Sequence, residues 1–409
     1  MMFSVTSLGF LPFMALFVCL WYRVPQPSRW KLVLAANAVF CLSIDIGAFF
    51  AVALATAVVW QAAQHAQPEQ PSRRGWLALG LAAALLPLLV LKYSGMLVPG
   101  LRDLYKPFGL AYYSLQLAGY LLDVWHGRTA PTPSYARLWC YAGFFLSLTQ
   151  GPFNRYNTLM PQLEAAPKTF ETQRLVSGLQ RSAWGYFKKF AIADRAAIVV
   201  SAAFADPASF DRSQLIFATV MYSFQLYADF SGYTDIVLGM GEILGLHLPE
   251  NFRQPFLAAS VKELWARWHI SLSQWFRDYV YIPLGGNRKG IARRDANLLL
   301  TFLVSGLWHG ANWTFLVWGG LHGLCQVAED HMPAPLRKRK SLPLRIVGVP
   351  LTFAIFVTTF TIFRTSSLGN AAAYFAGILH NPGHEVFAQY WLLGLTSKLE
   401  LLLLLLGIA

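Results

Sequence analysis

A histidine in an apolar stretch is the first residue of this chain whose type and setting could support catalysis. His309 lies in the run Gly306-Leu-Trp-His-Gly-Ala-Asn-Trp313. An ionisable side chain in an apolar segment marks a candidate functional site, and a neutral imidazole can take a proton from a hydroxyl group near neutral pH. Gly310 would allow a substrate or a neighbouring helix to approach closely. The alternative is a hydrogen-bonded packing histidine, and this segment alone does not separate the two.

A second histidine, His269, lies in a stretch with apolar and charged residues at helical spacing. The apolar members are Val261, Leu264, Trp265, Trp268, Leu272, Trp275, Phe276 and Tyr279, and the charged members are Lys262, Glu263, Arg267, Arg277 and Asp278. We expect one amphipathic helix over 261–280. It is too polar to face lipid, so it lies at the interface or lines a wet cavity inside the protein. His269 could bind substrate, orient His309 or satisfy a carbonyl group; taken alone, a packing role is favoured.

Two carboxylates, Asp229 and Asp235, lie in the run Tyr227-Ala-Asp-Phe-Ser-Gly-Tyr-Thr-Asp235, which has an apolar helix expected on each side. Buried carboxylates need partners. Arg253, Arg267 and Arg277 are the available cations if these segments meet. We expect a structural ion-pair network, with substrate contact as the second interpretation.

Other polar residues give weaker signals. His380 and His384 are four residues apart, but Pro382 and Gly383 would break a helix that aligned them, so we expect a loop. His322 is expected to pack or to line a secondary pocket. The chain has no His-Glu-x-x-His, phosphate-binding Gly-x-x-x-x-Gly-Lys, Gly-x-Ser-x-Gly or Gly-x-Gly-x-x-Gly motif. Zinc proteases, nucleotide hydrolases, serine hydrolases and Rossmann enzymes lose support, and we expect no metal site.

The composition places these residues in a membrane protein. Of 409 residues, 56% are hydrophobic and 13% are charged, against about 25% charged in an ordinary soluble domain. The net charge is +13, but the basic residues fall between apolar runs, as loop charges that set topology do. Nucleic acid is therefore not an expected partner. The four cysteines stand singly in apolar surroundings and are expected to be small core residues.

Apolar runs long enough to cross a bilayer recur along the chain. They cover 3–21, 31–48, 49–64, 76–97, 108–125, 136–150, 176–204, 213–228, 233–248, 344–363 and 388–409. We predict an all-α, polytopic integral membrane protein with roughly ten or eleven transmembrane helices plus re-entrant or interfacial helices. Residues 1–409 would form a single membrane domain. The loops 65–74, 287–295 and 332–345 are rich in Lys and Arg and are expected in the cytoplasm.

The segment around His309 is too long for one spanning helix. Residues 296–328 are apolar, and at about 1.5 Å per residue they would reach about 50 Å as a helix, beyond the ~30 Å hydrocarbon thickness. Gly306 and Gly310 interrupt this segment. We expect a break near His309, which at membrane depth must be buried in protein or face water.

These blocks together resemble the membrane-bound O-acyltransferase family. The resemblance rests on Asn251-Phe-Arg-Gln-Pro-Phe256, on the run from Glu263 to Arg288, and on Gly306 to Trp313, with support from Gly151-Pro-Phe-Asn-Arg155, Phe187-Lys-Lys-Phe190 and Asp229 to Asp235. It spans about residues 105–325, and the blocks follow the family's order. It is strongest to the bacterial branch of alginate O-acetyltransferase membrane subunits and teichoic-acid D-alanyl transfer proteins.

The resemblance implies a function and a set of site residues. The family's catalytic histidine falls on His309, and its second signature histidine falls on His269. It implies helices around a thinned centre, where a cytoplasmic acyl thioester meets an acceptor from the outer face. His309 would deprotonate an acceptor hydroxyl, and His269 would position the donor together with its neighbours. The residues expected to bind substrate are Trp268, Arg267, Trp308, Asn312, Asp229 and Tyr233.

The same resemblance implies partners and a location. We expect no bound cofactor but an acyl thioester co-substrate, either acetyl-CoA or an acyl carrier protein. The expected acceptor is an extracytoplasmic polysaccharide, reached through an SGNH-type acyltransferase partner. The expected location is the bacterial cytoplasmic membrane, in contact with its lipid. Donor choice would depend on a basic cytoplasmic mouth formed by Arg288, Lys289, Arg293 and Arg294.

Two alternatives remain open at this stage. One is transfer of D-alanine from a carrier protein to teichoic acid. The other is a transporter or lipid flippase, because intramembrane Asp and His also suit proton coupling. The transporter alternative predicts inverted repeats, and we find none in the sequence.

The sequence also departs from the branch's usual residues at Thr149-Gln150 and in the run Tyr112-Tyr-Ser-Leu-Gln116, where an acceptor path could be tuned. The chain ends within the apolar run 399–408, where family members commonly continue.

Overall fold

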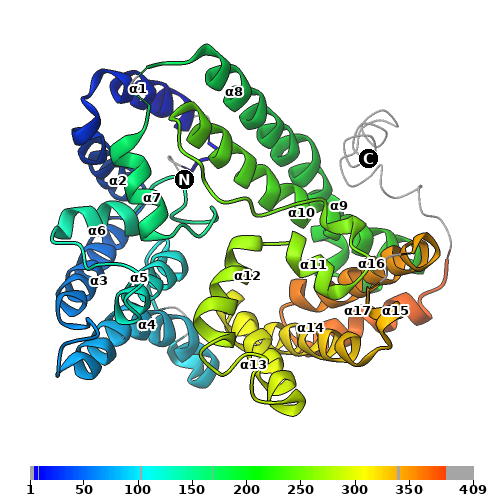
Figure 1. The fold of residues 1–409 in the computed structure, drawn as a ribbon. Coiled ribbons are helices and arrows are strands. Elements are labelled where there is room, and N and C mark those ends of the chain that lie inside the picture. Colours follow the sequence, from blue (N-terminus) through cyan, green and yellow to red (C-terminus); the bar gives the residue numbers. More distant parts are fainter. Residues whose placement is uncertain (1–3, 8, 102–103, 168, 339–340, 384–409) are drawn as a thin grey trace. The chain divides into compact units, whose positions relative to one another are not determined.

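Helices make up the regular structure of the protein. The computed structural model describes residues 4–7, 9–101, 104–167, 169–338 and 341–383. Within these ranges the α-helices are α1 (Phe10–Arg23), α2 (Arg29–Ile44), α3 (Ile46–His65), α4 (Arg73–Leu97), α5 (Leu110–Trp125), α6 (Tyr135–Ala142), α7 (Tyr156–Ala165), α8 (Thr172–Phe187), α9 (Asp194–Ala205), α10 (Arg212–Ile243), α11 (Val261–Arg267), α12 (Ile270–Phe276), α13 (Ile291–His309), α14 (Trp313–His331), α15 (Ala334–Lys338), α16 (Leu342–Arg364) and α17 (Leu368–His380) (Figure 1). The predicted all-α class is confirmed for this part of the chain, and the expected run 388–409 lies outside it.

The chain divides into two compact units. The first unit is Met1–Trp184 with Tyr233–Glu250, and the second is Gly185–Gly232 with Asn251–Ala409. Helices α8 and α10 contribute residues to both units. The candidate histidines His269 and His309 both belong to the second unit.

The first unit is held by buried polar contacts between its helices and loops. Asp45 caps the start of α3 by accepting from Gly47 N at 2.9 Å, and its second oxygen accepts from Phe108 N at 3.0 Å. Arg29, 1% exposed, donates to Pro167 O at 2.6 Å. Such pairings satisfy groups that would otherwise be costly to bury.

Three helices are long and apolar enough to cross a membrane among the described residues: Ile46–His65, Arg73–Met96 and Leu342–Arg364. Large apolar side chains lie exposed on all three, including Leu54 at 69%, Leu86 at 54% and Val347 at 67%. Such side chains are costly in water and suit contact with lipid.

Several predicted boundaries are wrong for identifiable reasons. The run 136–150 is helical only over α6, because Asn37 binds the next turn instead: its Nδ2 donates to Cys140 O and its Oδ1 accepts from Phe145 N, both at 2.9 Å. The runs 213–228 and 233–248 form the single helix α10. Gly232 does not break α10, because it lies against α8, where an added Cβ would meet Gly185 O at 2.7 Å. The first helix begins at Phe10, later than expected.

The break predicted near His309 is confirmed. Helix α13 ends at His309, Gly310 is extended, and α14 begins at Trp313. Asn312 caps α14 by accepting from Thr314 N at 3.3 Å. The imidazole therefore lies at a helix end inside the second unit.

Candidate active site

Close packing of α13 on α14 fixes the position of His309. A Cβ added at Gly306 would lie 2.3 Å from Phe315 O, and one added at Gly319 would lie 2.4 Å from Phe302 O. The two backbones therefore approach as closely as glycine permits. A Cβ at Gly310 would meet the ring of Phe315 at 1.9 Å. The space left by Gly310 is thus taken by a side chain of the neighbouring helix.

The imidazole of His309 is only partly buried and is surrounded by aromatic rings. Its ring centroid lies 4.9 Å from Trp308, 5.1 Å from Trp318 and 5.4 Å from Phe363. The aromatic neighbours fix the orientation of the ring, and the residue keeps partial exposure. His309 is therefore held firmly without being fully buried.

The expected single helix over 261–280 is wrong. The segment forms α11 and α12, each of seven residues, followed by the π-helical turn Arg277–Tyr281. The helix breaks because residues 251–253 take its backbone hydrogen bonds: Arg253 N donates to Arg267 O and Ile270 N donates to Asn251 O, both at 3.0 Å. Phe252 and Trp268 form an isolated antiparallel bridge at this point.

The break places His269 in an unusual conformation. Its φ is 44°, in the left-handed region, which residues other than glycine seldom adopt and which tends to occur at functional sites. Asn251 Oδ1 supports the turn by accepting from Ser271 Oγ at 2.6 Å and from Ser271 N at 3.2 Å. His269 is 2% exposed and lies 6.3 Å, centroid to centroid, from His309. The two predicted histidines are therefore neighbours.

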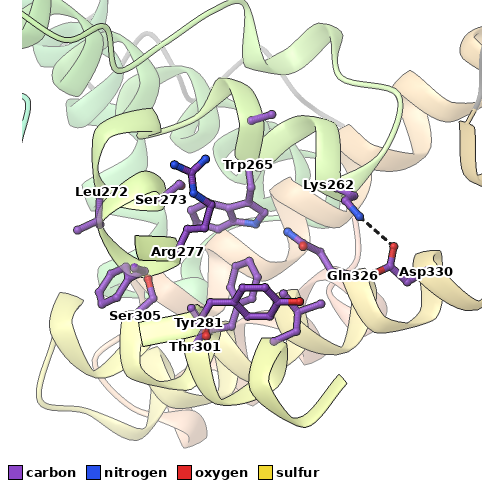
Figure 2. Close-up of a pocket in the computed structure, with 14 residues that line it drawn as sticks. Lys262, Trp265, Leu272, Ser273, Arg277, Tyr281, Thr301, Ser305, Gln326 and Asp330 are labelled. Atoms are coloured by element: carbon purple, nitrogen blue, oxygen red, sulfur yellow. Dashed lines mark hydrogen bonds and ion pairs between the residues drawn. The ribbon is translucent and has the colours of Figure 1, made fainter. Parts of the chain in front are cut away.

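A cavity of about 320 Å³ lies against the segments that carry both histidines. It is lined from five elements: the π-helical turn Arg277–Tyr281 and four α-helices, which contribute among others Lys262 and Trp265 on α11, Ser273 on α12, Ser305 on α13 and Gln326 on α14 (Figure 2). Ser305 precedes His309 by four residues, one helical turn. Ser273 N donates to His269 O at 3.0 Å. Each histidine is thus four residues from a lining residue, although neither histidine is itself part of the lining.

The charges around the cavity include a cation and an anion that are paired. Lys262 Nζ lies 3.0 Å from Asp330 Oδ1, with side-chain exposures of 64% and 13% (Figure 2). Arg277 also lines the cavity and is bonded to its neighbour Asp278 at 2.9 Å. Of the four residues expected at a basic mouth, Arg288, Lys289 and Arg293 are exposed, while Arg294 pairs with Asp295 at 2.7 Å and lies 3.9 Å from Asp330 of the cavity wall. Their role in donor choice stays a prediction.

A buried carboxylate anchors α11 beside the cavity. Glu329 of α14, 7% exposed, accepts from Val261 N at 2.8 Å and from Lys262 N at 3.0 Å. These are backbone N–H groups of the first turn of α11, which have no partner within their own helix. Ser260 caps the same helix by accepting from Glu263 N at 3.0 Å. Glu329 of α14 therefore fixes the position of α11 and of its residue Trp265.

The predicted substrate-binding residues are distributed unevenly. Trp308 is near both histidines, 6.2 Å from His269. Trp268 is 4% exposed in an aromatic cluster, 5.0 Å from Phe356. Arg267 is bonded to Glu263 at 2.6 Å, and Asn312 donates to Ser366 O at 2.5 Å besides capping α14. Of these four, only Trp308 is seen in contact with the histidine pair.

The two acids have partners other than those expected. Asp229 pairs with Lys189 at 2.7 Å, and Lys189 also pairs with Asp194 at 2.9 Å. In the first unit Asp235 pairs with Arg181 at 3.1 Å. The expected pairing with Arg253, Arg267 or Arg277 is wrong, because the preceding helical segments supply the cations.

Tyr233, which follows Asp229 on α10, belongs to the first unit, where its hydroxyl bonds Thr149 Oγ1 at 2.8 Å. The substrate-binding roles predicted for Asp229 and Tyr233 stay predictions. Thr149 is one of the two residues noted as departures from the usual branch pattern.

Sequence reasoning missed residues that the fold brings to the site. Ser305 and Ser273 could have been found at four-residue spacing from the histidines. Trp318, which contacts His309, carries no such signal because its partner lies on another helix. His322 is a packing residue as expected: it is 0% exposed and bonded to Trp265 and Thr359. His380 ends α17, while His384 lies outside the described residues.

Comparison with known proteins identifies the family of this chain. Residues 92–367 match MBOAT, the membrane-bound O-acyltransferase family. A protein of Azotobacter vinelandii named "Probable alginate O-acetylase AlgI" is 34% identical over 397 residues, covering 92% of this chain and 78% of the relative. A peptidoglycan O-acetyltransferase of Helicobacter pylori is 31% identical over 350 residues, covering 77% and 66%. A teichoic acid D-alanyltransferase of Bacillus subtilis is 27% identical over 335 residues, covering 76% and 84%.

The family match includes α13, α14 and the segment that carries His269, so the histidine pair lies inside the matched region. Two thirds of the chain fall within it, and relatives above 30% identity extend the likeness over most of the rest. The chain belongs to the membrane-bound O-acyltransferase family and is an O-acyltransferase.

Proposed function

We propose that the protein moves an acetyl group from a cytoplasmic thioester across the membrane for O-acetylation of an extracytoplasmic polysaccharide, with His309 as the catalytic base. The observation that carries this proposal is the position of His309. It ends α13 as a partly exposed imidazole, 6.3 Å from His269 and one turn from the wall of a cavity of about 320 Å³.

The proposed reaction needs one proton carrier. His309 takes the proton of the acceptor hydroxyl, and the oxygen attacks the carbonyl carbon of the thioester. The tetrahedral intermediate collapses with cleavage of the carbon–sulfur bond, and the leaving sulfur takes the proton back from the imidazolium. The products are an ester and a free thiol, and the enzyme is unchanged. General base catalysis of this kind is worth roughly 10²–10⁴-fold.

The cavity suits the thioester donor better than a polysaccharide. Its lining alternates apolar groups with isolated hydroxyl and amide groups, including Thr301 and Ser305 at four-residue spacing on α13. A pantetheine arm carries amide and hydroxyl groups along a flexible chain, so it matches such a lining. Lys262 and Arg277 would meet the phosphate of the arm. We propose His269 as a positioning residue for this donor.

Acetyl is the favoured acyl group. The relatives above 30% identity bear names for O-acetyl transfer, to alginate and to peptidoglycan, whereas the D-alanyl transferase is 27% identical. We further propose a multi-pass location in the bacterial cytoplasmic membrane with ten or eleven spanning helices, and an SGNH-type partner that completes transfer outside the membrane. Acetyl-CoA or an acyl carrier protein would supply the thioester.

The test uses native membranes that contain the full chain. Radiolabelled acetyl-CoA and the host's cell-envelope polysaccharide are supplied, and label in the polysaccharide is measured after alkaline release. The His309→Ala variant is expected to lose at least about 100-fold in rate, because the proton acceptor is removed. Near-normal transfer by this variant would reject the assignment.

His380→Ala is the matched control. This histidine is exposed at the end of α17, and Nδ1 bonds Ala376 O of its own helix at 3.0 Å. Transfer by that variant should equal wild type. A parallel assay with a D-alanyl carrier protein distinguishes the acyl groups: incorporation of D-alanine without acetyl would replace the proposed donor.

A further inference from the structure

The indole N–H of Trp318 is buried beside His309 in an unusual state. Trp318 is 1% exposed, and its Nε1 has no hydrogen-bond acceptor among the described residues. The ring lies 5.1 Å from the His309 ring at 85°, edge against face. A buried donor that lacks an acceptor has lost its hydrogen bond to water on folding, and no hydrogen bond within the protein replaces it. Such groups are uncommon enough in native proteins to need an explanation.

Apart from His309, the rings around Trp318 do not provide an acceptor. His322, 5.1 Å away, accepts the N–H of Trp265 at Nδ1, 3.3 Å. Its other nitrogen must then carry the proton and donate to Thr359 Oγ1 at 3.0 Å. The hydroxyl of Thr359 is itself directed to Ile355 O at 2.8 Å. Both nitrogens of His322 are therefore committed, and the phenylalanine neighbours carry no strong acceptor.

The position of this N–H is fixed before any substrate arrives. Gly319, the next residue, lies against the backbone of Phe302, and the Trp318 ring packs 5.6 Å from Trp265 and 5.4 Å from Phe360. Trp265 and Phe302 both line the cavity. Trp318 therefore packs against a residue of the cavity wall on one hand and against His309 on the other. A donor held rigidly in an apolar setting costs no reorganisation when charge develops next to it.

We propose that Trp318 donates its indole N–H to the carbonyl oxygen of the acyl thioester as that oxygen becomes negative. This inference rests on the proposed function. When the acceptor oxygen bonds to the carbonyl carbon, the π electrons of the carbonyl move to its oxygen, and the N–H hydrogen bond strengthens. When the carbon–sulfur bond breaks, those electrons return. Trp318 itself gains and loses no covalent bond.

The test replaces the N–H and keeps the ring. Trp318→3-benzothienylalanine, introduced into the full chain by codon suppression, puts sulfur in place of the N–H with little change of shape. Transfer from acetyl-CoA in native membranes should lose roughly 10²–10³-fold in kcat, with KM for acetyl-CoA within about twofold and an unchanged or higher unfolding temperature. Trp318→Phe should show the same kcat loss along with lower stability from the lost volume.

A matched control comes from the first unit. Trp139 is 7% exposed, and its Nε1 also has no acceptor among the described residues, but its ring packs on Phe49, not on a histidine. The benzothienyl replacement of Trp139 should leave kcat at the wild-type value. If it lowers kcat as much as the replacement of Trp318 does, the effect is not specific to the site and the assignment falls.

The outcomes separate this inference from the proposed function. Full kcat in the benzothienyl variant of Trp318 would overturn the role of Trp318 while His309→Ala stays inactive. A loss confined to KM would overturn it as well, since a transition-state donor acts on kcat. Transfer by His309→Ala would instead overturn the proposed function itself.

Discussion

His322 and His309 lie on successive helices of one unit and touch the same tryptophan, yet their surroundings differ. The Trp318 ring is 5.1 Å from each of them. His322 is 0% exposed, in the middle of α14, with both nitrogens hydrogen-bonded. His309 is partly exposed at the end of α13, next to a glycine and a three-residue connection.

Under the proposed function, the difference separates an imidazole that is buried for packing from one that is kept for chemistry. A saturated imidazole inside a helix holds its neighbours in place, and any change of its charge would break bonds. An imidazole at a helix end can meet a ligand that arrives through a cavity. Location within the helix and access, more than residue type, therefore separate the two roles.

The largest effect on stability and on transfer is expected for Gly306→Ala, because this substitution disturbs the α13–α14 contact that holds His309. Gly306→Ala would put a Cβ 2.3 Å from Phe315 O, which is backbone and cannot rotate away. The helices must separate, at a cost of roughly 1–3 kcal/mol or more. Both the unfolding temperature in detergent and the rate of transfer should fall.

Gly320→Ala is the control for this contact, because its Cβ would meet only Leu303 Cδ2 at 3.6 Å. Alanine is a better helix former than glycine, so stability should hold or rise. If Gly306→Ala behaves like Gly320→Ala, the close contact does not position His309 and the contrast between the two histidines loses its structural basis.

An intermediate effect, on stability alone, is expected when His322 loses its hydrogen bond to Thr359. Thr359→Val removes the acceptor of the His322 Nε2 hydrogen while keeping the shape, leaving a buried donor at a cost of roughly 1–3 kcal/mol. Unfolding should occur at a lower temperature, and transfer per folded molecule should stay the same. Thr361→Val serves for comparison, since that hydroxyl bonds only Val357 O of its own helix. A tenfold loss of transfer in Thr359→Val would contradict a purely structural role and would show that His322 takes part in the reaction.

The smallest effect is expected at a third histidine, which is exposed. His331 Nε2 lies 2.7 Å from Asp295 Oδ2. This hydrogen bond, with that of Arg294, lowers the pKa of Asp295 below its ordinary 3.8. A lowered pKa stabilises the fold above the ordinary value, and the gain is lost as the pH falls through the folded-state pKa. Asp295→Asn should speed hydrogen exchange at the start of α13 at pH 6, and this difference should shrink as the pH falls below 3.8. A pH-independent difference would contradict the ion pair.

The sequence predicted the parts of the site that depend on neighbouring residues. The apolar length of 296–328 and its glycines placed the break at His309, and the motif blocks paired His309 with His269. The second break, at Trp268 and His269, could not be predicted, because residues 251–253 cause it from a distance along the chain. For the same reason Lys189 and Arg181, not the later arginines, proved to be the partners of Asp229 and Asp235.

Glu329 and Asp330 are adjacent on α14 and both hold α11, but with different strength. Glu329 is buried and binds two backbone groups, whereas Asp330 forms ion pairs with the mostly exposed Lys262 and, at 3.9 Å, with Arg294. Exposed ion pairs contribute only about 0–1 kcal/mol. An anionic ligand can therefore replace Asp330 as the partner of Lys262 at little cost in free energy. The cavity can therefore exchange the partner of its cation for a ligand while α11 stays anchored.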